Sequence, residues 1–277
     1  DDTISLRLPA YTTARTRNIR NGGAINMDEL TETKVDVTLS TDVYKAVPIT
    51  DAELTLDIED FGRQVLNPSV MSVARGIEDN VASTIENATY PAAHQIDLDE
   101  QAPLNTLTRA GRLLNDANVP REGRTFLAGS AVEEALLNGI ELLSKVNESG
   151  TDSALREATI GRLRGFEIVG SNAIDPNKAY AFHRTAYALS LQAPVVPDGA
   201  TWGTSASSNG LAMRALRDYD FANVRDRLLV NTFVGSNVVT DQGDFDENGK
   251  WVPWDGSHPE DSSSLVRAVE ITYDEGS

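Results

Sequence analysis

The stretch that most limits how this chain can fold is a long run of apolar residues at helical spacing that begins just after Asn67-Pro68. Asparagine is a favoured N-cap and proline a favoured first helical residue, so this pair predicts where the helix begins. The apolar residues that recur along one face are Val70, Val73, Ala74, Ile77, Val81 and Ile85. A stripe of this length predicts an amphipathic helix over residues 67–88 that packs against another layer of the protein. Gly76 lies inside the stripe, which indicates a close packing contact at that point.

The segment before this helix has the opposite character, because residues 15–58 contain few large apolar side chains. Asn21-Gly22-Gly23 is a turn signal. Two runs of alternating apolar and polar residues follow and predict half-exposed strands, one with Val35, Val37 and Leu39 and one with Leu54, Leu56 and Ile58. Upstream of the turn, the polar stretch 11–19 also tolerates a strand, so the pattern predicts a β-hairpin with its tip near residues 20–32. A two-stranded hairpin is marginal on its own, so we expect a partner to cover it.

Helix and strand signals alternate through the rest of the chain. Pro103 opens a second helix with leucines at helical spacing, and Asn118-Val119-Pro120 ends it. Ser130 is the expected N-cap of a third helix, with Glu133 at capping-box spacing. Strands are expected at residues 124–128 and within 161–171, 180–191, 224–239 and 265–273, and loops over 144–158 and 194–210. This mixture predicts an α+β fold.

The charge balance excludes one broad class of function. The chain has 277 residues with 42 acidic and 24 basic side chains, so its formal net charge is -18. A main surface that grips nucleic acid usually needs a basic footprint, which this balance argues against. The acidity suits a surface that must stay soluble beside a polyanion, although a high-salt habitat or a GC-rich genome could give the same composition. Cysteine is absent, which excludes disulfides, thiol nucleophiles and cysteine-ligated metals.

Positive charge is concentrated near the N-terminus. Residues 1–20 contain four arginines and no acid after Asp2. Such a segment is either a frayed terminus or an arm that docks on a neighbour. Close packing of many copies with this net charge requires screening or arginine–carboxylate pairs between them. The further arginines that we consider for such pairs are Arg63, Arg75, Arg214, Arg217, Arg225 and Arg227.

The motifs of catalysis are missing from the sequence, which contains no glycine-rich phosphate loop, no Gly-x-Ser-x-Gly and no His-Glu-x-x-His. We therefore expect no enzymatic activity, no catalytic residue and no cofactor-binding residue. His183 lies in an apolar strand, where a satisfied core or interface histidine is the favoured interpretation over a catalytic one. His94 and His258 lie beside acids in predicted loops and are expected to face water.

One acidic segment has the spacing of a calcium loop. Asp244, Asp246, Asn248 and Asp255 would supply oxygens at positions 1, 3, 5 and 12, with Gly249 at position 6. The alternative is a β-hairpin in which Asn248-Gly249 forms a type I′ turn. We favour the hairpin, because Pro253 and Trp254 prevent the usual second helix and the flanks alternate like strands. No metal site is therefore predicted, and calcium binding stays open as the second interpretation.

Five segments together resemble, in their order, the major capsid proteins of tailed viruses. They are the stretch from Val47-Pro-Ile-Thr to Asp60-Phe-Gly that runs into Asn67-Pro68, then Val119-Pro-Arg-Glu-Gly-Arg-Thr-Phe-Leu-Ala-Gly-Ser, Gly165-Phe-Glu-Ile-Val-Gly-Ser, Ala181-Phe-His-Arg-Thr-Ala-Tyr-Ala-Leu, and Arg214 to Asp220. The resemblance spans nearly the whole chain. It implies the Hong Kong 97-type capsid fold, in which an arm and an extended loop lie across neighbouring subunits. Relatives that cross-link use a loop lysine, but neither Lys34 nor Lys45 lies in a matching motif.

The resemblance also implies a division of the chain. An N-terminal arm (1–14) and an extended β-hairpin loop (15–58) would precede a peripheral domain (59–122) with the spine helix 67–88. A central axial domain (123–215) would follow, and residues 216–277 would return to the peripheral domain with an acidic hairpin insertion at 241–262. The residues expected at intersubunit contacts are Arg15, Arg17, Arg20, Lys34 and Lys45.

The function that follows from the resemblance is structural. The chain would self-assemble through hexamers and pentamers into the icosahedral shell of a virion, made in the host cytoplasm. That shell would enclose double-stranded DNA without sequence-specific binding and without a membrane. Scaffolding, portal and decoration proteins are further partners that the resemblance allows. The alternative function is a calcium-binding, β-rich surface or adhesion module, which would lack the long helix and the central α/β block.

Overall fold

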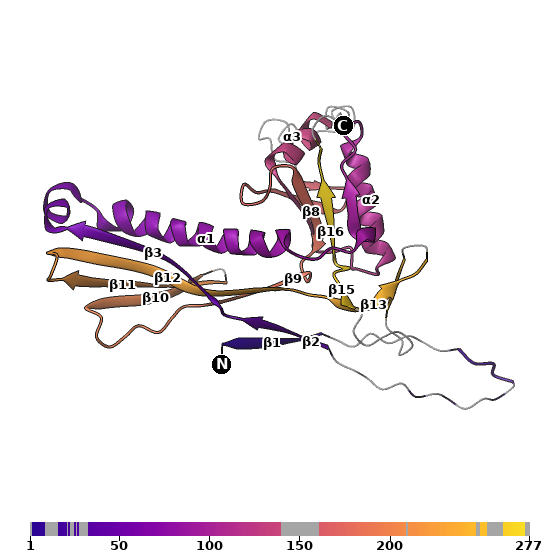
Figure 1. Ribbon diagram of the computed structural model, residues 1–277, viewed down its shortest axis with the longest axis horizontal. Coiled ribbons are helices and arrows are strands. Elements are labelled where there is room, and N and C mark those ends of the chain that lie inside the picture. Colours follow the sequence, from indigo (N-terminus) through magenta and orange to yellow (C-terminus); the bar gives the residue numbers. More distant parts are fainter. Residues whose placement is uncertain are drawn as a thin grey trace. The chain divides into compact units, whose positions relative to one another are not determined.

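The computed structural model describes residues 2–8, 16–20, 22, 25, 27, 33–139, 161–208, 210–247, 250–253 and 263–274. The chain divides into two compact units, whose helices and strands are drawn in Figure 1. Unit 1 comprises residues 1–4, 36–86 and 188–237, and unit 2 comprises residues 5–35, 87–187 and 238–277. This division differs from the predicted domain bounds, because helix 103–116 groups with unit 2 and residues 188–215 group with unit 1.

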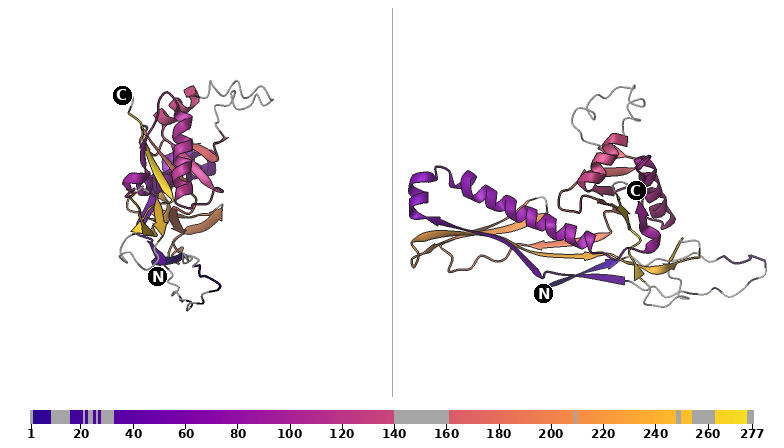
Figure 2. Two further views of the ribbon diagram at one scale, coloured as in Figure 1. Left: turned by 90° about the vertical axis from the view of Figure 1, so that its right-hand side faces the viewer. Right: turned by 45° about the horizontal axis from the view of Figure 1, so that its top comes forward.

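Unit 1 is an antiparallel sheet with one long helix on its face (Figure 1). The strand order is β10 (Trp202–Ser208), β11 (Leu211–Asp220), β12 (Arg225–Val238) and β3 (Thr41–Thr50), and β9 (Tyr187–Gln192) also pairs with β12. Helix α1 (Asn67–Glu86) runs along the sheet beside β3 and β12, as the right-hand view of Figure 2 also shows. Alternate residues of β12 are buried beneath it, including Leu228 and Val230.

The predicted stripe of α1 is confirmed as the face that packs on this sheet. Of the predicted residues, Val73, Ile77 and Ile85 are buried, whereas Val70, Ala74 and Val81 are half-buried. The predicted close contact at Gly76 is also present, because an added Cβ would lie 2.6 Å from the Cγ1 atom of Val43 in β3. Glycine therefore allows the helix to approach the strand more closely than alanine would.

Helix α1 begins at Asn67, as the sequence predicts, but the predicted role of Asn67 as the N-cap is wrong. Asn67 has helical angles (φ -60°, ψ -47°) and is not the N-cap, because a wider helical turn, η2 (Gly62–Leu66), leads directly into α1. The segment is capped at Asp60, whose Oδ1 atom accepts the N–H of Arg63 at 3.2 Å. In return, the side chain of Gln64 accepts the N–H of Asp60 at 3.1 Å. This reciprocal pairing caps the start of the helical segment at Asp60. The Asn67-Pro68 signal in the sequence pointed to a later residue.

The predicted strand at residues 54–58 is also wrong, since residues Glu53–Asp57 form a short helical turn, η1. Thr50 and Glu53 form a reciprocal capping box there. The Glu53 carboxylate accepts both the N–H and the hydroxyl of Thr50 at 2.8 Å, and Thr50 Oγ1 accepts the N–H of Glu53 at 3.3 Å. The Thr-x-x-Glu spacing of a capping box thus prevails over the apolar alternation.

A third correction concerns residues 194–210, which were expected to form a loop. Residues Trp202–Ser208 instead form β10, the edge strand of the sheet in unit 1. Apart from Trp202 and Thr204, the residues of β10 are glycine, alanine and serines, so the ladder with β11 is what keeps this strand extended. An added Cβ at Gly203 would lie 2.5 Å from Val196 and 2.8 Å from Leu216, which shows how closely neighbouring side chains cover it.

Unit 2 is built on a six-stranded mixed sheet. Its order is β4 (Gln95–Asp97), β16 (Ala268–Thr272), β8 (Lys178–His183), β5 (Arg124–Ala128), β7 (Phe166–Gly170) and β6 (Arg162–Leu163). Helices α2 (Pro103–Asp116) and α3 (Ser130–Gly139) pack on it, and the short helix η3 (Ala92–His94) precedes β4. The core between these layers includes Leu107, Phe126, Leu136 and Phe166, all at most 1% exposed. The strands predicted at 124–128, 161–171, 180–191 and 265–273 are confirmed, the second and the third each as two strands.

The ends of the helices in unit 2 are held by backbone groups. Asn118 takes the left-handed conformation (φ 57°) and ends α2 where the sequence predicts. At the start of α3, the carbonyl of Pro176 accepts the N–H of Ala131 at 3.1 Å. The neighbouring Gly129 is required for this approach, since an added Cβ would lie 2.3 Å from the carbonyl oxygen of Asp175.

Two small sheets complete the described chain. β1 (Thr3–Leu8) pairs with β2 (Thr33–Thr38), so the predicted strand around Val35 is confirmed, with the N-terminal residues as its partner. The second sheet has the order β14 (Trp251–Pro253), β13 (Asp241–Phe245) and β15 (Ser263–Ser264). The loop predicted at 144–158 and most of the hairpin tip predicted at 20–32 lie outside the described residues.

Candidate functional site

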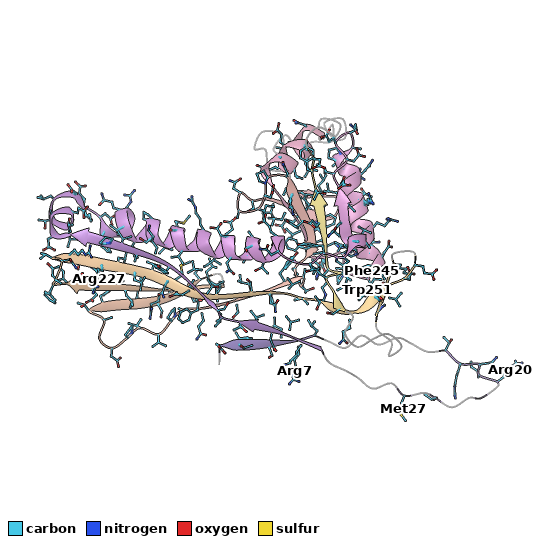
Figure 3. The ribbon with its side chains drawn as sticks, in the orientation of Figure 1. Arg7, Arg20, Met27, Arg227, Phe245 and Trp251 are labelled. Atoms are coloured by element: carbon cyan, nitrogen blue, oxygen red, sulfur yellow. The ribbon has the colours of Figure 1, made fainter. Side chains whose placement is uncertain are left out.

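The residues predicted at intersubunit contacts are exposed wherever the structure describes them. Arg17, Arg20, Lys34 and Lys45 are exposed, and Arg15 lies outside the described residues. Lys34 belongs to β2 and Lys45 to β3. Figure 3 shows the side chain of Arg20 extending away from the ribbon of its segment. Exposure fits a role in binding a second copy, and that role stays a prediction.

Large apolar side chains near Arg17 and Arg20 are exposed too. Ile19 is 96% and Met27 94% exposed, and Met27 is labelled in Figure 3. A soluble chain gains nothing by presenting such side chains to water. Together with the neighbouring arginines they make this segment both basic and apolar, a combination suited to a partner surface with carboxylates and apolar groups.

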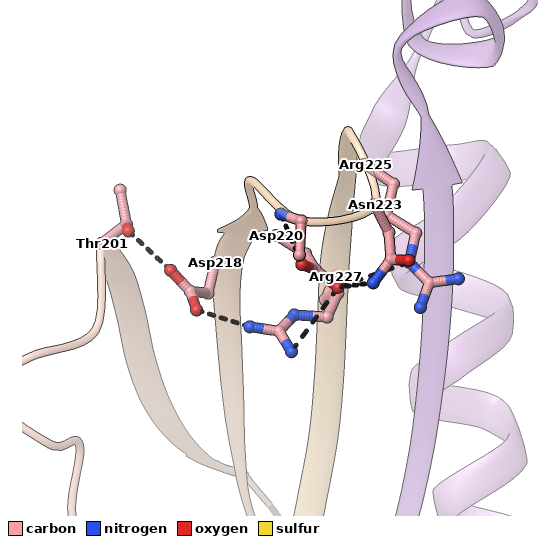
Figure 4. Close-up of polar contacts among 7 residues, drawn as sticks. Thr201, Asp218, Asp220, Asn223, Arg225 and Arg227 are labelled. Carbon is pink, nitrogen blue, oxygen red and sulfur yellow. Dashed lines mark hydrogen bonds and ion pairs between the residues drawn. The ribbon is translucent and has the colours of Figure 1, made fainter.

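A second surface lies at the end of the sheet in unit 1, where β11 turns into β12 (Figure 4). Four ion pairs link the two strands, and the longest of them joins Arg227 to Asp220 at 4.0 Å. Arg227 contacts Asp218 at 3.0 Å, Arg225 contacts Asp220 at 3.6 Å, and Arg217 pairs with Asp226. The sequence suggested these arginines for contacts between copies. The structure pairs them with carboxylates of their own chain, and a contact with another copy stays a prediction.

Hydrogen bonds lower the pKa of two carboxylates of this end, those of Asp218 and Asp220. The Thr201 hydroxyl and then Arg227 lower the pKa of Asp218, and the Asn223 side chain contributes most to lowering the pKa of Asp220. Both carboxylates therefore stay ionised, which keeps the ion pairs in place at neutral pH. Arg217 also lies over the ring of Phe61, with its guanidinium carbon 4.7 Å from the ring centroid.

The turn between these strands presents apolar groups that sequence reasoning missed. Phe221 is 86% exposed, and Val224 is 58% exposed with φ at 50°. A β-branched residue in the left-handed region is strained, so the surrounding contacts must hold it there. Asp220 provides them by accepting the N–H of Ala222 at 3.1 Å and the side-chain amide of Asn223 at 2.8 Å. An aspartate that precedes Asn223 at this spacing is a turn signal that could have located the site.

The acidic segment predicted either as a hairpin or as a calcium loop is a hairpin. β13 and β14 pair antiparallel, with Phe245 opposite Trp251, and the N–H of Asp246 donates to the carbonyl of Lys250 at 2.9 Å. Asp246 Oδ1 also accepts the N–H of Lys250 at 2.8 Å. Asn248 and Asp255 lie outside the described residues. Among the residues that are described, no group of histidines and acids is arranged to hold a metal ion.

The prediction that His94 faces water is wrong. Its side chain is buried (2% exposed), its Nδ1 atom lies 3.0 Å from the carbonyl oxygen of Ala268, and its ring contacts Phe245 edge-on. Phe245 in turn contacts Trp251, and Figure 3 labels this aromatic pair. Burial lowers the pKa of His94. The apolar residues of the hairpin, which the sequence gave no reason to place over His94, are what removes it from solvent.

The prediction that His183 is a satisfied buried histidine agrees with its surroundings. Its Nδ1 atom lies 2.8 Å from the Thr185 hydroxyl, and that hydroxyl also accepts a bond from Arg267 at 2.9 Å. Arg267 forms a bidentate ion pair with Asp241. Burial is the largest cause that lowers the pKa of His183. His258 lies outside the described residues.

The helices that the structure describes are all too short or too polar to cross a membrane. No protein-family model matches the chain, and no curated protein matches its sequence. Its fold, however, matches many solved structures.

A chain of Mycobacterium phage Che8 is 20% identical, with a TM-score of 0.63 over 98% of this chain and 84% of that one. The capsid of cyanophage P-SCSP1u gives 12% identity and a TM-score of 0.62, covering 99% and 84%. The capsid of an empty GTA particle gives 10% identity and the same score, covering 99% and 85%. This chain therefore has the Hong Kong 97-type fold of tailed-phage major capsid proteins.

Proposed function

We propose that this chain is the major capsid protein of a tailed virus and that many copies of it form an icosahedral shell around double-stranded DNA. The observation that carries the proposal is the extent of the structural match. The match to each of the three phage and GTA structures named above covers at least 98% of the chain. We propose no catalytic residue and no cofactor.

The segment that carries Arg17, Ile19, Arg20 and Met27 is best suited to bind a second copy of the same chain. Ile19 and Met27 would lose their contact with water there, while Arg17 and Arg20 would meet carboxylates of an acidic neighbour. Hexamers and pentamers are the assemblies that such contacts would build. Lys34 and Lys45, which are exposed on β2 and β3, would add to the same contact.

The shell would be the outer layer of the virion, with its subunits made in the host cytoplasm. Scaffolding, portal and decoration proteins are the further partners. A net charge of -18 on each copy would keep the enclosed DNA from adhering to the protein, so DNA would be held by enclosure and not by sequence-specific binding.

Electron microscopy of the purified chain is the direct test, and shells or capsomers are the expected result. A variant without residues 20–32 should remain folded, with an unchanged unfolding midpoint, and should fail to form stable shells. Normal shells from that deletion would show that the extended loop is dispensable. A wild-type chain that forms neither shells nor capsomers in any condition would refute the proposal as a whole.

Ionic strength provides a second test, because like charges repel when acidic copies pack closely. Shells should loosen at low salt, and Arg17→Glu or Arg20→Glu should reduce assembly further. The yield of shells after sedimentation measures both effects. Equal stability from very low to molar salt would contradict this electrostatic account.

The alternative function, a calcium-binding β-rich adhesion module, is less well supported. Helix α1 has 20 residues and α2 has 14, and both bury apolar faces against sheets. An all-β adhesion module has no use for these layers.

A further inference from the structure

One end of the six-stranded sheet in unit 2 gathers arginines. Strand β5 begins at Arg124, which is paired with His183 at the end of β8, and Phe182 beside it is paired with Ala268 at the start of β16. The parallel pairing of Thr125 with Glu167 puts the start of β7 at this same end. The arginines that lie here are Arg121, Arg124, Arg162, Arg164, Arg184 and Arg267.

Two of these arginines are fully used inside the unit. Arg124 is buried and donates to the carbonyls of Pro120, Gly111 and Val119 and to the side chain of Asn115. Arg267 is paired with Asp241. These contacts hold the loops at this end of the sheet in place. The bonds of Arg124 go to carbonyl and amide oxygens, so its charge has no carboxylate partner among the described residues.

The other four arginines are exposed, and none of their guanidinium groups has a hydrogen-bond or ion-pair partner within the described part of the chain. We name Arg121, Arg164 and Arg184, which lie in the turns of this end, the arginine edge. The nearby carboxylates that the structure describes are those of Glu122 and Glu167, which are exposed and have no side-chain partner among the described residues. Counted over the described residues alone, and including Arg124 and Arg162, five arginines without a carboxylate partner thus lie beside two carboxylates, on a chain whose net charge is -18.

The backbone holds the edge in a defined shape. The N–H of Arg184 donates to the carbonyl of Gly123 at 3.0 Å, and the Arg184 side chain crosses Gly123, where an added Cβ would lie 3.0 Å from its Cδ atom. Arg164 and Gly165 form the two-residue turn between β6 and β7, with φ of 51° and 91°. Glycine or asparagine normally fills the first position, so a strained arginine there indicates a use for its side chain.

From this geometry we infer that the arginine edge binds carboxylates of a second copy of this chain. The inference rests on the proposed shell assembly and names one of its contacts. Cations that repel one another at one edge are stabilised by an anionic partner, and arginine binds carboxylates through two parallel hydrogen bonds. Each copy offers 42 acidic residues against 24 basic ones. Nucleic acid is the weaker choice, since the net charge of the whole chain repels a polyanion.

The test compares Arg121→Glu and Arg184→Glu with Arg109→Glu, an exposed arginine of α2 that carries the same charge change. Thermal unfolding of each variant checks that the subunit is intact. Sedimentation velocity measures self-association, and electron microscopy counts shells. We expect the two edge variants to weaken self-association at least about tenfold, Arg184→Lys to retain most of it, and Arg109→Glu to match the wild type.

Two outcomes would overturn the inference while leaving the proposed function intact. One is normal self-association and normal shells from both edge variants. The other is normal assembly combined with loss of binding to a double-stranded DNA fragment, which would assign the edge to nucleic acid. A wild-type chain that stays monomeric in every condition would instead refute the capsid proposal together with this contact.

Discussion

Gly76 of α1 and Val43 of β3 lie so close that a single methyl group cannot be added between them. A Cβ on Gly76 would be 2.6 Å from Val43 Cγ1. Valine is stiff about its χ1 angle, so the methyl group cannot swing aside without strain. This contact sets how closely the long helix approaches the edge of its sheet.

The first prediction follows from that contact. Gly→Ala in a helix ordinarily stabilises a protein by about 1 kcal/mol. At position 76 we expect the opposite, a loss of about 1–3 kcal/mol from overpacking, measured by chemical denaturation. Val43→Ala should restore stability in the double variant. Gly111→Ala in α2 is the matched control, because its Cβ would lie at an ordinary 3.5 Å from Phe166 and should not destabilise.

The second prediction concerns the stripe of α1. Ile77 is 4% exposed and packs in the core of unit 1. Ile77→Ala should lower the free energy of unfolding of the isolated subunit by about 2–5 kcal/mol. Met71→Ala, on the same helix but 59% exposed, should change it little. An unaltered unfolding midpoint for Ile77→Ala would mean that the stripe serves contacts between copies instead.

The third prediction separates two ion pairs of the β11–β12 end. Arg217 pairs with Asp226, which is 8% exposed, whereas the side chains of Arg227 and Asp218 are about half exposed at 53% and 50%. Arg217→Met leaves a buried carboxylate without its donor and should cost about 1–3 kcal/mol. Arg227→Met should cost less than about 1 kcal/mol, because water solvates the remaining carboxylate. Equal losses in denaturation experiments would contradict this dependence on burial.

The fourth prediction concerns pH and His94. Burial lowers its pKa below the ordinary value of 6.5, so the unfolded chain binds this proton more readily than the folded chain. The contribution of neutral His94 to the free energy of unfolding is therefore fully present above pH 6.5, and it is lost as the pH falls below that value. His94→Gln should reduce the fall in unfolding temperature between pH 7 and pH 5. His183→Gln should remove a separate part of this fall in unfolding temperature, since burial also lowers the pKa of His183. A variant curve parallel to that of the wild type would exclude His94 as a source.

Sequence reasoning located what depends on local pattern. The stripe of α1, the close contact at Gly76 and several strands of both sheets, among them β12 and β16, follow from periodicity and turn residues. Sequence reasoning failed where a long-range contact or a competing local contact determines which secondary structure forms. Apolar alternation at Leu54 predicted a strand, but the Thr50–Glu53 cap forms a helical turn. The small residues of β10 suggested a loop, but pairing with β11 makes a strand.

The candidate sites were predictable only in part, for the same reason. Exposure of Arg17 and Arg20 agrees with the composition of their segment. In contrast, the sequence does not reveal that Arg217 already has a partner in Asp226, because pairing depends on the register of β11 and β12. The burial of His94 depends on a hairpin about 150 residues away along the chain. The arginine edge is assembled from the ends of several strands and has no continuous sequence signal.

The last prediction concerns the acidic hairpin and calcium. Asp246 Oδ1 already accepts the N–H of Lys250, so this carboxylate closes the turn without a metal ion. Calcium should therefore raise the melting temperature no more than magnesium does at equal ionic strength, and Asp246→Asn should be nearly silent, since an amide oxygen accepts the same bond. A melting-temperature rise that is specific to calcium, reversed by chelator and abolished by Asp246→Asn, would show that the loop binds the ion. The hairpin would then be held by the metal as well as by the pairing of Phe245 with Trp251.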